Sequence, residues 1–147
     1  MESIFPILRT THYFLMLVLL IFLLFTIGKF ISKKFSDEPF GAMEDKTTLV
    51  VMILAHVQLL LGLTLLFTGP MSAHFADMGA AMKDSYIRMM VVEHPMSMIL
   101  GVVMVTLGRL KWKKKETDDA KFKTVIIFFS IALVLFLARI PWGHFHG

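Results

Sequence analysis

The chain has 147 residues, of which 56% are hydrophobic and 18% charged, and its formal net charge is +4. This composition is too apolar for a soluble domain of this length. Cysteine is absent, which excludes disulfides, iron–sulfur clusters and covalently attached haem, so any cofactor is expected to be non-covalent. The sequence also lacks nucleotide-hydrolysis, zinc-protease and serine-hydrolase motifs, which makes a hydrolase or an ATPase an unexpected class.

Four apolar stretches follow one another along the chain, at residues 10–28, 47–68, 86–108 and 124–140. About 20 apolar residues in a helix span the hydrocarbon core of a bilayer, where each backbone amide must bond within its own segment. Each stretch is therefore predicted to be a transmembrane helix, including the first, which lacks the cleavage site of a signal peptide. Short connections favour an all-α membrane protein of one domain, residues 1–147, built as an up-down-up-down bundle of four transmembrane helices.

The connections differ in their content of basic residues. Those that follow the first and third stretches are rich in lysine and arginine, whereas the middle connection and the chain ends hold chiefly Arg9, Lys83 and Arg88. By the positive-inside rule the basic connections face the cytoplasm, and both termini lie on the outer, periplasmic side of a bacterial inner membrane. The basic residues thus report topology, and no nucleic-acid partner is expected. Residues 75–83 of the middle connection are predicted to form a short interfacial helix.

Three histidines fall inside the predicted spans, where an ionisable side chain is costly and so indicates function. At a rise of 1.5 Å per residue, His12 and His94 each lie roughly 10 Å below the outer face, whereas His56 lies about 10 Å from the inner face. Two imidazoles at one level on different helices can bind haem iron from opposite faces. The competing interpretation is a hydrogen bond from each histidine to a neighbouring helix. Gln58 is expected to bond either His56 or another helix.

Three charged residues lie at the outer ends of the third and fourth stretches. Arg88 and Arg139 are at a depth suited to contacts with haem propionates or to ion pairs. A third interpretation is that their long side chains extend to the interface between membrane and water. Glu93, next to a predicted haem ligand, could accept a proton from quinol. The competing interpretation of Glu93 is a structural salt bridge.

Small residues and a proline surround His94. Ser97, Gly101 and Gly108 share a helical face with it, which either leaves room for a flat macrocycle or serves ordinary helix packing. Pro95 removes a backbone hydrogen bond and is predicted to kink the helix. The methionines close to His94 raise copper(I) as an alternative ligand, because thioethers prefer soft metals.

Several segments together resemble a group of small bacterial four-span membrane proteins known as cytochrome b or cytochrome b561-like. They are RTTH at 9–12, HVQLLLG at 56–62, DMGAAMKDS at 77–85, EHP at 93–95, KFK at 121–123 and IPW at 140–142. The resemblance implies haem b and electron transfer, with ligands at His12 and His94 and with His56 as the substitute. A second haem is not expected, because His56 has no evident partner at its own level.

The sequence thus favours a haem b protein that exchanges electrons with quinol near the outer face, in which Arg88, Glu93 and Arg139 contact the haem or the quinol. The alternative is a cofactor-free accessory subunit that packs against a larger respiratory or other membrane complex. A transporter is less favoured, because transporters usually contain broken helices or repeats around a central site, and Pro95 is the only sign of a broken helix in the sequence.

Overall fold

The computed structural model describes residues 4–144, which form helices and connections and contain no strand. Three of the four long helices are α1 (Ile4–Phe35), α2 (Ala42–Thr68) and α6 (Asp118–Ala138). The other one, Ser85–Trp112, comprises α4 (Ser85–Arg88), a π-helical turn η2 (Met89–Glu93) and α5 (His94–Trp112). The short elements are η1 (Pro70–Asp77), α3 (Met78–Lys83) and η3 (Trp142–His144).

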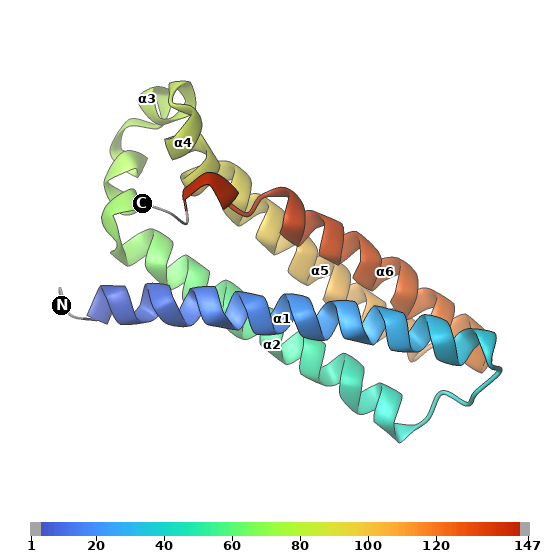
Figure 1. The fold of residues 1–147 in the computed structure, drawn as a ribbon. Coiled ribbons are helices and arrows are strands. Elements are labelled where there is room, and N and C mark those ends of the chain that lie inside the picture. Colours follow the sequence, from blue (N-terminus) through green and yellow to red (C-terminus); the bar gives the residue numbers. More distant parts are fainter. Residues whose placement is uncertain (1–3, 145–147) are drawn as a thin grey trace.

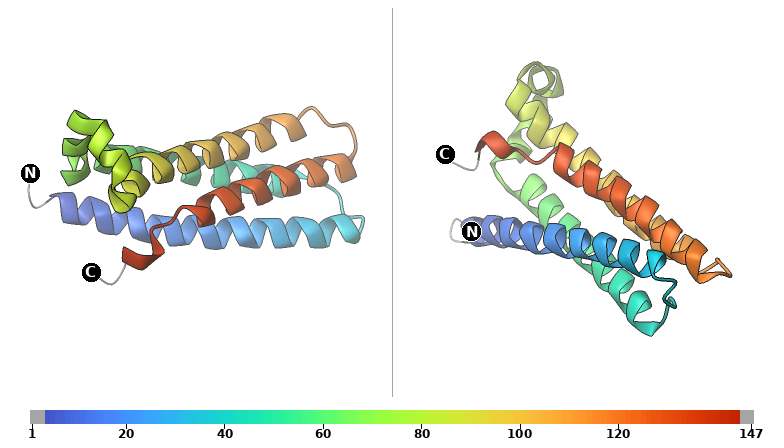
Figure 2. Two further views of the ribbon diagram at one scale, coloured as in Figure 1. Left: turned by 90° about the horizontal axis from the view of Figure 1, so that it is seen from above. Right: turned by 45° about the vertical axis from the view of Figure 1, so that its right-hand side comes forward.

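The long helices form an antiparallel ring in which α1 packs on α2 and α6, and α5 packs on α2 and α6 (Figures 1 and 2). This is the predicted up-down-up-down bundle. Both ends of the described chain lie at the same end of the bundle as η1, α3 and α4 (Figure 1). In Figure 1, α1 separates from α6 toward this end, which we call the splayed end. The opposite end, with the connections 36–41 and 113–117, is the closed end.

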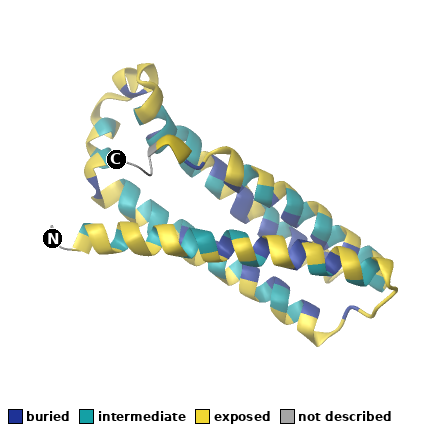
Figure 3. Ribbon diagram, in the orientation of Figure 1, coloured by how far each residue is buried: buried dark blue, intermediate teal, exposed yellow. Residues whose placement is uncertain are grey.

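The outward faces of the long helices are apolar. Ile21, Leu60 and Val134 are among the most exposed large side chains, with exposed fractions of 69%, 65% and 65%. Buried residues lie along the inward faces instead (Figure 3). All four long helices have the length and apolar composition to cross a membrane. Such a surface is unfavourable in water and suits lipid, so the fold supports a multi-pass membrane protein.

Polar residues bind the helices together at the closed end. The buried carboxylate of Glu44 accepts a hydrogen bond from Lys33 at 2.7 Å and thereby joins α2 to α1. The buried guanidinium of Arg109 lies 2.6 Å from both the hydroxyl of Thr48 and the carboxylate of Asp45, and joins α5 to α2. An aromatic cluster adjoins these contacts, formed by Phe30, Phe40, Trp112 and Phe122. The bundle is therefore fixed at one end and open at the other.

The observed helices are longer than the predicted spans. α1 runs to Phe35 rather than to residue 28, so its basic last turns are helical and extend past the apolar stretch. α6 begins at Asp118 because the side chain of Thr117 accepts a hydrogen bond from the amide of Ala120 and caps the helix. The predicted interfacial helix at 75–83 is observed as the end of η1 and α3.

Candidate functional site

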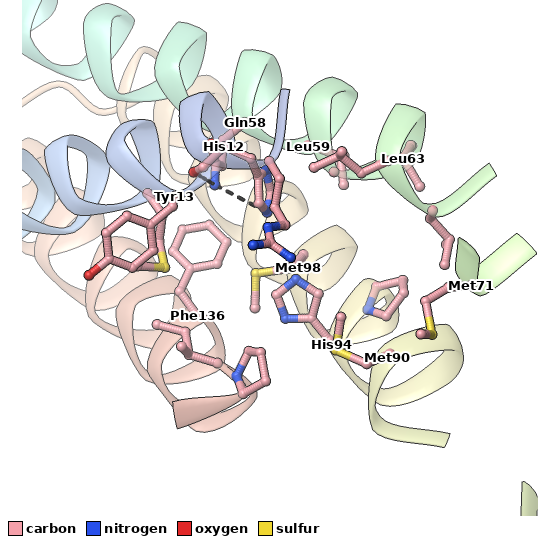
Figure 4. A pocket seen from close by; sticks show the side chains of 18 of the residues that line it. His12, Tyr13, Gln58, Leu59, Leu63, Met71, Met90, His94, Met98 and Phe136 are labelled. Carbon is pink, nitrogen blue, oxygen red and sulfur yellow. Dashed lines mark hydrogen bonds between the residues drawn. The ribbon is translucent and has the colours of Figure 1, made fainter. Parts of the chain in front are cut away.

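Two histidines meet at the splayed end of the bundle. His12 comes from α1 and His94 from the first turn of α5, and their ring centroids are 6.5 Å apart with the ring planes at 81°. Figure 4 shows the two rings in the same space between the helices. The structure therefore brings together the two residues that the sequence placed at one level.

The backbone before His94 is reshaped by Pro95. Proline has no N–H, and the chain before it forms the π-helical turn η2, in which the amide of His94 donates to the carbonyl of Met89. The predicted kink thus takes the form of a wider turn. Nδ1 of His94 lies 2.7 Å from the carbonyl oxygen of Arg139. Because that oxygen can only accept, Nδ1 carries the proton, and Nε2 keeps its lone pair for another partner.

His12 is held from the neighbouring helix α2. The side-chain amide of Gln58 donates to the backbone oxygen of His12 at 2.9 Å and also lies 3.5 Å from Nε2 of the ring. Nδ1 of His12 is buried and has no hydrogen-bond partner among the described residues. Gly62, one turn further along α2, gives the ring space, since a Cβ there would lie 3.0 Å from its Cε1 atom. One nitrogen of the His12 ring thus lacks a hydrogen-bond partner and could bond a ligand.

Gln58 therefore has the interhelical role that the sequence favoured, and the expectation that it bonds His56 is wrong. His56 itself is exposed on α2, where its Nδ1 lies 2.8 Å from the carbonyl oxygen of Met52 in the same helix. It lines a shallow groove with Ile99 and Thr106, and neither of the other two span histidines takes part in that groove. The structure does not bring His56 to the histidine pair.

A cavity of about 560 Å³ adjoins the two histidines, within the range of sites for small molecules and cofactors. Its walls come from all four long helices and from η1, and they are mostly apolar (Figure 4). Four methionines contribute: Met16, Met71, Met90 and Met98. Arg9 is the one charged side chain among the described residues of the wall.

The three charged residues predicted near the site pair with one another. Glu93 lies between two arginines, with one oxygen 2.9 Å from Nε of Arg88 and the other 3.6 Å from Nε of Arg139. Arg88 also donates to the carbonyl of Met82 at 2.8 Å. The ion-pair interpretation of these residues is confirmed. None of Arg88, Glu93 and Arg139 is among the described residues that line the cavity.

The small residues of α5 serve packing against α6. A Cβ at Gly101 would overlap the ring of Phe136, and one at Gly108 would lie 2.8 Å from Cβ of Phe128. Ser97 donates to the carbonyl of Leu135 at 2.7 Å. The expectation that this face leaves room for a macrocycle is wrong, because aromatic rings of α6 fill it. The open space lies instead among all four long helices, and Phe136 of α6 forms part of its wall.

Sequence reasoning did not assign Arg9 or Gly62 to the site. A signal for each was present, since Arg9 precedes His12 by three residues and Gly62 follows Gln58 by four, the spacings that share a helical face. Within the described part of the chain, no group of three or more histidine, aspartate or glutamate side chains could hold a bare metal ion. The chain matches no family model, no curated protein and no solved structure.

Proposed function

We propose that the protein binds one haem b through His12 and His94 and carries electrons in the membrane. The observation that supports this most is the pair of imidazoles, which come from different helices and have centroids 6.5 Å apart. Two imidazoles that bind one metal from opposite sides, with bonds of about 2.0–2.1 Å as known for zinc, have centroids roughly 6.4 Å apart. The observed spacing of 6.5 Å is close to that value.

The surroundings of the two rings also fit metal ligation. Ligating histidines usually donate their second ring nitrogen to a carbonyl or a carboxylate, which fixes the tautomer and the ring orientation. His94 has such a bond to the backbone of Arg139, and it leaves Nε2 available. His12 has an unpaired buried nitrogen, and its backbone is anchored by Gln58. The bond to Arg139 thus orients the ring of His94, while Gln58 fixes the backbone that carries His12.

The bound haem would supply one-electron redox chemistry, whose potential depends on ligands, burial and hydrogen bonds. The apolar walls would limit the access of water to it. Quinol is the proposed electron donor because it is a reductant that dissolves in the lipid around the bundle, and Glu93 and Arg88 are its proposed contacts near the outer face. The proposed orientation places the closed end in the cytoplasm of a bacterium, because the connections at that end are rich in basic residues.

The alternative, a cofactor-free subunit of a larger respiratory or other membrane complex, assigns the two histidines to interhelical hydrogen bonds. His94 does bond α6 through the backbone of Arg139, as that alternative requires. However, a subunit without a cofactor is expected to have a filled interior, whereas a cavity of about 560 Å³ adjoins the histidine pair. The cavity and the unpaired nitrogen of His12 favour the haem protein.

The test is a reduced-minus-oxidised visible spectrum of the detergent-purified protein, produced with ample haem. The proposal predicts a sharp b-type α-band that is lost in His12→Ala and in His94→Ala. The matched control is His56→Ala, which removes the third span histidine and should leave the band unchanged. A folded wild-type protein without haem absorbance would refute the proposal and make the accessory subunit the leading function.

A further inference from the structure

Arg9 is an unusual member of the cavity wall. It is the one charged side chain among the described lining residues, and the remaining wall is mostly apolar. It lies three residues before His12 on α1, so the two share a face, with Arg9 about 4.5 Å nearer the splayed end. A cation at this position is therefore next to whatever His12 binds.

Arg9 also differs from the other two arginines at this end. Arg88 and Arg139 both contact the carboxylate of Glu93, and neither lines the cavity. Within the described part of the chain, the guanidinium of Arg9 has no ion pair and no hydrogen bond to a side chain or to the backbone. Its five donors are thus available to a molecule in the cavity.

The described residues of the splayed end carry a net charge of +1, because four cations (Arg9, Lys83, Arg88 and Arg139) stand against three carboxylates (Asp77, Asp84 and Glu93). A guanidinium binds a carboxylate through two parallel hydrogen bonds, which fixes the position of the carboxylate as well as its charge. Haem b carries two propionate carboxylates on one edge of its ring, so its charge complements this end of the bundle. The free arginine in the wall is the one placed to reach it.

We propose that Arg9 binds a carboxylate of the ligand in the cavity, which under the proposed function is a haem propionate. The inference rests on that function and assigns to Arg9 the role predicted from the sequence for Arg88 and Arg139. Those two arginines instead hold Glu93, and so they shape the end of the bundle from outside the cavity. Arg9 orients the ring from the propionate edge, while His12 and His94 bind the iron.

The experiment compares the binding of haem b and of its dimethyl ester, in which both propionates are uncharged. Apoprotein is titrated with each compound for the wild type, Arg9→Gln, Arg9→Lys and the control Lys83→Gln. Lys83 is an exposed cation of α3 at the same end of the bundle and does not line the cavity. Lys83→Gln therefore lowers the net charge by the same amount as Arg9→Gln without a change in the cavity wall. Circular dichroism verifies that each variant is folded.

We expect Arg9→Gln to bind haem about tenfold or more weakly than wild type, since hydrogen bonds to a charged group contribute roughly 1.5–3 kcal/mol. Wild type should prefer haem over the ester, Arg9→Gln should lose that preference, Arg9→Lys should regain part of it, and Lys83→Gln should keep all of it. Haem binding by Arg9→Gln at wild-type strength, or no preference in the wild type, would overturn the role of Arg9 and leave the proposed function standing. A wild-type protein that binds neither compound would refute both.

Discussion

Gly62→Ala is a substitution whose effect on the site can be worked out from the structure. The new Cβ would lie 3.0 Å from Cε1 of His12, so the ring must move by a few tenths of an ångström. Without a ligand the ring can move toward the cavity at little cost. When the ring is bound to a metal it cannot, and a side chain held about 30° from its rotamer costs roughly 0.5–1.5 kcal/mol. We therefore expect haem to bind about 2- to 13-fold more weakly.

The assay is a haem titration of the apoprotein, combined with thermal unfolding of the apoprotein. Alanine stabilises a helix by roughly 1 kcal/mol relative to glycine, so apoprotein stability should stay equal or rise while haem affinity falls. Gly28→Ala is the matched control, because a Cβ at Gly28 would meet no atom within 4 Å. Unchanged haem affinity in Gly62→Ala, or an equal loss in Gly28→Ala, would show that Gly62 does not give the ligating ring of His12 its space.

Three further pairs of substitutions test the fold and its orientation. Thr48→Val removes the hydroxyl that accepts hydrogen bonds from Arg109 and Trp112, so it should lower the free energy of unfolding by about 1–3 kcal/mol. The control Thr106→Val should change the free energy of unfolding little, because the hydroxyl of Thr106 bonds only its own helix. Gly101→Leu would place a side chain against the ring of Phe136 and should destabilise the protein by about 1–3 kcal/mol, whereas Gly28→Leu should not. Equal stability of the two variants would contradict the close packing of α5 on α6 at Gly101. The chain has no cysteine, so single cysteines can report which side of the membrane each connection faces. A membrane-impermeant maleimide added to whole cells should label Ala76→Cys and not Ser36→Cys, and the reverse pattern would show that the orientation is opposite to the one predicted.

Most of the fold could be predicted from the sequence, because the requirement for internal backbone bonding in lipid turns each long apolar stretch into a helix. The four long helices and their up-down-up-down order are as expected. The ends of the helices were less predictable. α1 continues through Lys33 because that lysine bonds the buried Glu44 of α2, a contact between residues that hydropathy assigns to a connection. Arg109 likewise is buried although its sequence context is a basic connection.

The common level of His12 and His94 could be predicted from helical rise, whereas the approach of the two rings to each other could not. Helical rise could not decide which of the residues near the two histidines would contact a ligand. The face of α5 that carries Gly101 could have met a ligand or another helix, and only the position of Phe136 on α6 decides between them. The sequence favoured Arg88 and Arg139 over Arg9 as contacts of the ligand, but both of them pair with the carboxylate of Glu93 and lie outside the cavity lining.

Under the proposed function, His12 and His94 together bind one metal centre. The most direct measurement is the electron paramagnetic resonance spectrum of the ferric protein loaded with one equivalent of haem b. We expect a low-spin signal typical of two histidine ligands, which becomes high-spin in His12→Ala and in His94→Ala and stays low-spin in His56→Ala. A high-spin signal in the wild type, or a low-spin signal that survives in both His12→Ala and His94→Ala, would contradict the proposed function.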